Sequence, residues 1–165
     1  MNRIYLAVVP AVIAVFAFAG CGGDSGGGNG GDGNGGGGNG GADGTAQDYL
    51  AQVVEIAQRV GELDSLLGAV ELGDDVAGSY AEEFRELQQS AKGLIPPEAL
   101  RDAHESYVEG IGGLADSAAL ADAAVQAGDE EALTSAKRVS DESSRLISDA
   151  LREISRIRGQ GSLEP

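Results

Sequence analysis

An unbroken alternation of apolar residues at spacings of four and three constrains this chain more than any other feature. The pattern runs over seven positions, Tyr49, Val53, Ile56, Val60, Leu63, Leu67 and Val70. Because an α-helix has about 3.6 residues per turn, this spacing places all of these side chains on one narrow stripe. The pattern predicts one long helix, over about 45–72, that packs against other helices.

Three more helices are predicted downstream. The second begins near Asp75 or Ser79 and ends before Pro96, because a residue that precedes proline is pushed out of the helical conformation. The third covers about 97–127, Gly128 and Asp129 then form a turn and cap, and the fourth helix runs from there to about 158. The residues expected to face inward on these helices are Tyr80, Phe84, Leu87, Ala91 and Leu94, then Leu100, His104, Tyr107, Ile111, Leu114, Ala118, Ala121 and Val125, then Ala136, Val139, Ser143, Leu146, Ala150, Ile154 and Ile157.

Short connections make consecutive helices antiparallel neighbours, so the predicted fold is all-α. It is an antiparallel up-down-up-down four-helix bundle over 45–160, followed by a disordered tail over 161–165. The last two helices are longer than the second, which predicts that a hairpin around 114–140 projects from the bundle. Gly110, with two more glycines at 112 and 113, indicates either a kink or a close approach by a neighbouring backbone.

The segment before the bundle cannot form a packed core. Glycine occupies 15 of the 23 residues over 22–44, and Asn, Asp, Ser and Ala occupy the rest. Such a chain behaves as a flexible coil with a root-mean-square span of roughly 25 Å. Residues 21–44 are therefore predicted to be a disordered linker.

Residues 1–20 have the three-part layout of an export signal. Arg3 gives a positive head, Ile4 to Phe18 is an uncharged apolar segment, and Ala19 and Gly20 are the small residues that a signal peptidase needs. The apolar run is shorter than the roughly 20 residues that a spanning helix requires. A permanent transmembrane helix is therefore the poorer interpretation.

The only cysteine of the chain follows this segment directly. With Phe18, Ala19 and Gly20 before Cys21, the segment resembles the lipobox of bacterial lipoproteins, although Phe18 stands where an aliphatic residue is usual. The resemblance covers residues 1–21 and implies cleavage between Gly20 and Cys21, with a diacylglyceryl group on the Cys21 thiol. It thus implies a lipid anchor in the cell membrane, with the protein on the extracytoplasmic side. The alternative is an ordinary secretory signal followed by a free cysteine.

Charge excludes several classes of function. Loss of the signal removes one basic residue, which leaves ten basic against 27 acidic residues and a net charge of −17. Phosphate binding needs clustered Lys and Arg, so no nucleic acid is expected as a partner. Because Cys21 is the sole cysteine, disulfides and further thiolate metal sites are excluded as well.

His104 is the one residue that chemistry could use inside the bundle. It is the only histidine, and it lies on the inward stripe three residues before Tyr107. A core histidine satisfied by one hydrogen bond is the simpler interpretation, and the serines of the fourth helix are interpreted as polar helix positions. Di-iron bundles need Glu-x-x-His on two helices, but residue 101 is Arg and no second His exists. No catalytic residue, metal site or cofactor is therefore expected, and the protein is not expected to be an enzyme.

Two functions from different classes follow. The first is a lipid-anchored, non-catalytic binding or accessory module that presents helix faces to another envelope protein. The alternative is a small-ligand or metal-binding module that uses the bundle interior near His104, Tyr107 and Tyr80.

The predicted anchor has a direct test. Intact mass spectrometry of membrane-extracted protein should find an amino terminus at Cys21 that carries lipid. The Cys21→Ala variant should leave the membrane fraction, because without acyl chains only the acidic bundle and the linker remain. An unmodified thiol at Cys21 would contradict the lipobox interpretation.

Overall fold

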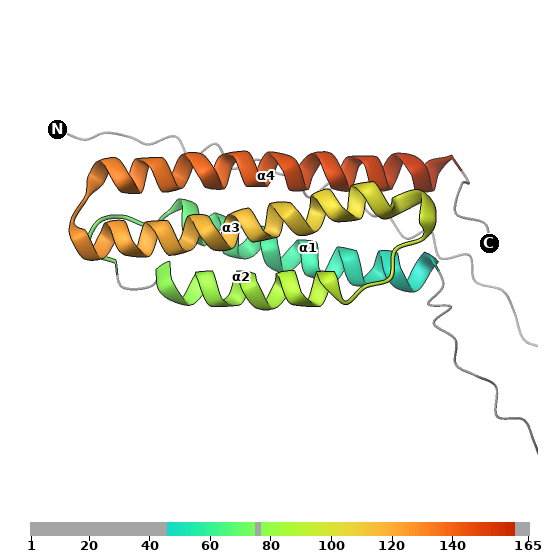
Figure 1. Cartoon of the computed structure of the whole chain (residues 1–165), viewed down its shortest axis with the longest axis horizontal. Coiled ribbons are helices and arrows are strands. Elements are labelled where there is room, and N and C mark those ends of the chain that lie inside the picture. The colour runs from blue at the N-terminus through green and yellow to red at the C-terminus, as the bar shows by residue number, and fades with distance from the viewer. Residues whose placement is uncertain (1–45, 75–76, 161–165) are drawn as a thin grey trace, which may run out of the picture. The chain divides into compact units, whose positions relative to one another are not determined.

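The computed structural model describes residues 46–74 and 77–160, and within these ranges the chain is all-helical. Four helices lie side by side and pack against one another (Figure 1). They are α1 (Ala46–Gly68), α2 (Ala77–Lys92), α3 (Arg101–Ala127) and α4 (Glu130–Gly159), with a short 3-10 helix, η1 (Glu98–Leu100), before α3. The predicted all-α fold of four packed helices is thereby confirmed. The predicted signal, Cys21, the linker and the tail over 161–165 lie outside the described residues.

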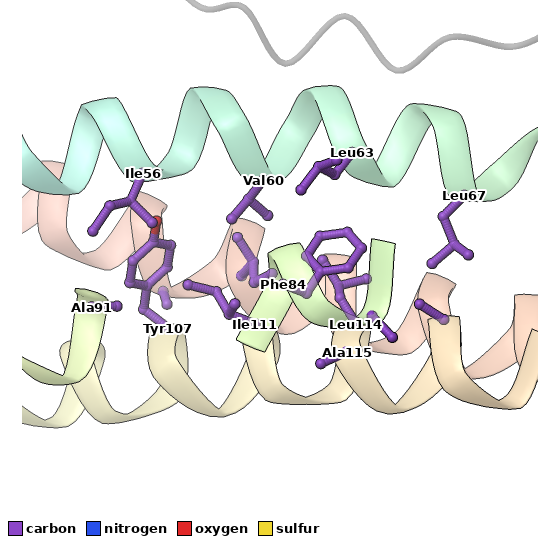
Figure 2. Close-up of a cluster of buried hydrophobic side chains, with 14 of the residues drawn as sticks. Ile56, Val60, Leu63, Leu67, Phe84, Ala91, Tyr107, Ile111, Leu114 and Ala115 are labelled. Carbon is purple, nitrogen blue, oxygen red and sulfur yellow. The ribbon is translucent and has the colours of Figure 1, made fainter. Parts of the chain in front are cut away.

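The apolar stripe of α1 is buried along its whole length, as predicted. Figure 2 shows Ile56, Val60 and Leu63 directed from α1 into the bundle interior, where Phe84 and Tyr107 also lie. Burial of each such side chain stabilises the fold by about 1.5–3 kcal/mol. The stripe is therefore the main attachment of α1 to the other helices.

α1 ends at Gly68, four residues before the predicted end, yet the last member of the stripe stays in the core. The Val70 amide donates to the Leu67 carbonyl at 3.1 Å, which tightens the chain into a turn. Val70 is consequently 2 % exposed. The apolar pattern thus predicts that Val70 is buried, although this residue lies beyond the end of the helix.

The turn between α3 and α4 has the predicted caps. Gly128 adopts the left-handed conformation with φ 67°, and its amide donates to the Val125 carbonyl at 3.1 Å. The Asp129 carboxylate then accepts a hydrogen bond from the Ala132 amide at 2.9 Å and caps α4. At the other end of α3, the predicted single helix over 97–127 instead starts as η1, because the Leu100 amide donates to the Pro97 carbonyl at 2.8 Å.

A close approach of α3 and α4 explains the glycines in the middle of α3. A Cβ atom at Gly110 would lie 2.5 Å from Ile147 Cγ1 and 3.2 Å from the Ser143 carbonyl oxygen. At Gly113 a Cβ atom would collide with the hydroxyl of Ser143. α3 runs through this region as one continuous helix. Of the two alternatives left by the sequence, the structure therefore supports the close approach.

The approach also corrects the predicted inward face of α4. Ile147 is 6 % exposed, whereas its neighbour Leu146, which was predicted to face inward, is only partly buried. The backbone of α4 lies so near Gly110 that the side chain at 147, and not at 146, fills the space between the helices. On α2, the small residues Ala77 and Ala81 are buried while Tyr80 is partly buried.

The prediction that a hairpin around 114–140 projects from the bundle is wrong. Near the start of α2, a Cβ atom at Gly78 would lie 3.2 Å from the Asp122 carboxylate of α3. On α1, the Asp64 carboxylate accepts a hydrogen bond from Ser140 of α4 at 2.9 Å. Both α1 and α2 therefore contact the segment that the helix lengths alone predicted to project.

The glycine contact predicts opposite effects of the same substitution at two helical sites. Gly110→Ala should destabilise the protein by about 1–3 kcal/mol, because the new methyl group overlaps Ile147. Gly61→Ala is the matched control, since no atom lies within 4 Å of a Cβ there, and it should stabilise by about 0.5–1 kcal/mol. Urea unfolding of both variants measures the two changes. Equal effects would contradict the close approach.

Candidate functional site

His104 lies in the first turn of α3, where it meets the first turn of α1. The ring is 7 % exposed, and its Nδ1 atom lies 3.1 Å from the hydroxyl oxygen of Tyr49. The two rings meet edge to face, with their centroids 5.6 Å apart. One hydrogen bond joins the pair whichever ring nitrogen carries the proton. The structure thus gives His104 a buried partner, Tyr49, that the sequence did not predict.

Tyr107 lies one turn further along α3 and is fully buried. Its hydroxyl donates a long hydrogen bond, 3.5 Å, to the Val53 carbonyl of α1. Tyr49, His104 and Tyr107 therefore form one polar cluster, the Tyr–His cluster, between the beginnings of α1 and α3. The Tyr49 hydroxyl, the His104 Nδ1 atom and the Tyr107 hydroxyl each form a hydrogen bond to the other of these two helices.

Burial keeps the Tyr–His cluster uncharged. Loss of solvent raises the pKa of the Tyr49 hydroxyl to about 12. Burial, with a smaller contribution from Tyr49, raises the pKa of Tyr107 well above its usual range. Burial lowers the pKa of His104, against the opposing effect of the nearby Glu105 carboxylate. At neutral pH the three groups are consequently neutral, as expected of a structural cluster.

Tyr80, the third predicted site residue, is not part of this cluster. It lies two residues from Gly78, which contacts Asp122, whereas His104 is in the first turn of α3. The 18 positions between His104 and Asp122 correspond to about 27 Å along a helix at roughly 1.5 Å per residue. The structure therefore brings His104 and Tyr107 together and leaves Tyr80 far away.

A second polar cluster joins α1 to α4. The Asp64 carboxylate accepts hydrogen bonds from the hydroxyls of Ser140 at 2.9 Å and Ser144 at 2.7 Å. From the sequence alone, these serines are interpreted only as polar helix positions. Their spacing of four residues, which puts both on one face of α4, was the available signal. Nothing in the sequence identified Asp64 as the partner on α1, because it is one acidic residue among many.

The buried polar groups of the described ranges are all used within the bundle. Ser117 donates to the Ala136 carbonyl at 2.8 Å, and Ser143 donates to the Val139 carbonyl at 2.9 Å. No buried side-chain nitrogen or oxygen atom in the described residues lacks a partner. The same residues contain no group of three or more His, Cys, Asp or Glu side chains that could hold a metal ion.

Two open grooves lie on the outside of the helices. The first, between α1 and α2, has polar and apolar lining in nearly equal parts, and Arg59 in it forms ion pairs with Glu62 at 3.0 Å and with Glu83 at 2.5 Å. The second lies over α3 and α4 and is mostly apolar, with Leu120 and several alanines in its lining. Of the helices in the described ranges, none has the length and apolarity needed to cross a membrane.

Comparisons with protein-family models, with curated proteins and with solved structures found no match to this chain.

The Tyr–His cluster predicts a loss of stability in mild acid. The folded state lowers the pKa of His104, so between that value and about 6.5 the unfolded state binds more protons. The free energy of unfolding should therefore fall as the pH drops below about 6.5, and this fall should level off below the folded pKa. In His104→Gln, which cannot titrate, the slope in this window should vanish. Urea unfolding at a series of pH values from 7.5 to about 5 measures it, and the same slope in both proteins would contradict the assignment.

Proposed function

We propose that this protein is a lipid-anchored lipoprotein on the extracytoplasmic side of the cell membrane, whose helical bundle is a non-catalytic binding or accessory module for another envelope protein. The lipobox-like residues before Cys21 support the anchor. The glycine-rich linker over 22–44 supports a bundle that is held at variable distance from the membrane, because such a chain has no preferred conformation.

In this proposal the bundle has the up-down-up-down arrangement. The order of contacts between neighbouring helices supports it. Gln88 of α2 bonds to Val108 of α3, and Gly78 lies against Asp122, so residue numbers fall along α2 as they rise along α3. The corresponding pairs between α3 and α4 are Gly110 with Ile147 and Ser117 with Ala136. Opposed numbering of this kind is expected of antiparallel neighbours.

The observation that carries the binding role is the complete pairing of buried polar groups in the described residues. His104 is joined to Tyr49, and Asp64 is joined to two serines of α4. A side chain that already holds two helices together must break that contact before it can bind or activate a substrate. The outer helix faces, by contrast, are available without such a cost. This favours recognition at the surface over chemistry in the interior.

The alternative of a small-ligand or metal-binding interior rests on the Tyr–His cluster. A ligand that binds only the folded protein raises its thermal midpoint. If the interior binds divalent metal ions, for example Zn²⁺, the midpoint should rise with added metal, and His104→Ala should abolish this rise. We expect no such response, because His104 Nδ1 is engaged and the described residues provide no set of further ligands around it.

The binding role is tested by enrichment of the tagged protein after cross-linking in its own cells, with mass spectrometry of what is recovered. We expect one envelope protein in near-equal amount, because an accessory module has a defined partner. The Cys21→Ala variant is the matched control, since it keeps the bundle but lacks the proposed anchor. Recovery of no specific protein, together with a metal-dependent thermal shift, would favour the interior instead.

A further inference from the structure

The groove over α3 and α4 is mostly apolar, unlike the groove between α1 and α2. Its apolar lining comes from Leu120, Ala123 and Ala127 of α3 and from Ala132 and Val139 of α4, and we call it the α3–α4 groove. Leu120 is 52 % exposed and stands beside the small alanine side chains. A large apolar side chain next to a shallow apolar hollow is the surface type that marks interaction sites.

Opposite charges lie along the same groove. Asp129 lines it at the end next to the turn, and Arg138 lines it further along α4. The nine positions between them correspond to about 14 Å at roughly 1.5 Å per residue. Arg138 is exposed and forms no ion pair with any residue that the structure describes. The groove thus has an acidic end and a basic end.

We propose that the α3–α4 groove binds the α3–α4 groove of a second copy of this chain, in an antiparallel pairing with two-fold symmetry. A two-fold axis that runs across the groove places Arg138 of each copy opposite Asp129 of the other. The contact between Arg138 and Asp129 therefore occurs twice in the dimer. This is the isologous geometry of symmetric dimers, in which one surface patch is complementary to itself. Arg138 then has an acidic partner, and the Asp129 carboxylate, which also caps α4, has a basic one.

The register of α3 and α4 fits this pairing. The hydrogen bond from Ser117 to the Ala136 carbonyl sets position 117 level with 136, so Leu120, three positions further along α3, lies nearly level with residue 133 of the antiparallel α4. That level is at the midpoint between Asp129 and Arg138. The two-fold axis therefore sets Leu120 of one copy against Leu120 of the other, with the small alanine side chains at 123 and 132 of both copies beside them. The apolar shapes and the charges are self-complementary in the same orientation.

We expect the affinity of the proposed dimer to be low. One shallow groove is smaller than a standard stable interface, and a net charge of −17 on each processed copy opposes association. The Arg138–Asp129 contacts set orientation more than affinity. The association therefore forms at high local concentration. It does not depend on the lipid anchor, so its test and the test of the anchor fail independently.

The test is cross-linking of the processed protein purified from its own cells, over a concentration series. Ala123→Cys places a thiol within about one helical turn of the two-fold axis on an exposed position, and a short bismaleimide then joins two copies. The parent protein, with Cys21 only, measures the background from that thiol. We expect a cross-linked dimer from Ala123→Cys whose yield rises with concentration, well above the background.

Two matched pairs of variants identify the surface. In the Ala123→Cys background, Leu120→Asp should lower the cross-linking rate by about tenfold or more, because it puts a carboxylate in the apolar contact. Leu66→Asp should leave the rate unchanged, since Leu66 is similarly exposed at 49 % but lies on α1, outside the groove. Arg138→Glu should lower the rate by about threefold. Arg145→Glu, on α4 beyond the groove, should not.

Three results would overturn the proposal. The first is an Ala123→Cys yield no higher than the parent background at the highest concentration. The second is an equal effect of Leu120→Asp and Leu66→Asp. The third is cross-linking of Ala123→Cys in intact cells to a different protein in place of a second copy, which would show that the groove has another occupant.

Discussion

The close approach of α3 and α4 is the contact on which the rest of the bundle depends. It exists because Gly110 has no side chain where Ile147 and the Ser143 carbonyl come near. Once the two helices touch there, their register is fixed, and the small residues on either side, such as Ser117, can bond across the interface. The pair then presents the surface against which α2 and the apolar stripe of α1 pack.

Hydrogen bonds fix the position of α1, which apolar packing alone does not determine. The stripe of α1 is attracted to any apolar surface, because the hydrophobic effect has no direction. The Tyr49–His104 bond at its start and the hydrogen bonds of Asp64 further along fix α1 against α3 and α4. A buried polar group left unpaired costs about 1–3 kcal/mol. A shift of α1 would therefore be unfavourable at the Tyr49–His104 bond and again at the hydrogen bonds of Asp64. Buried polar groups here specify the arrangement.

This use of polar groups shapes the function that we propose. His104, Ser117 and Ser140 are occupied in holding helices together, so our proposal assigns recognition to the outer faces. The apolar, oppositely charged α3–α4 groove is one such face, and a linker of low complexity would let it meet partners at many distances from a membrane. In the function that we propose, the module acts by presenting surfaces to a partner.

Sequence by itself determined the helices, because each carries its own periodicity and end signals. The stripe from Tyr49 to Val70 and the Gly128–Asp129 turn were predicted from local rules alone and were confirmed. The sequence could also foresee that His104 is buried, but not that Tyr49 is its partner, since the two are 55 positions apart. Likewise, only the tertiary structure decided between a close approach and a kink at Gly110, in favour of the close approach. Only the tertiary structure showed that Ile147, and not Leu146, is the buried residue. Those outcomes depend on the distance between two helix axes, which no single helix encodes.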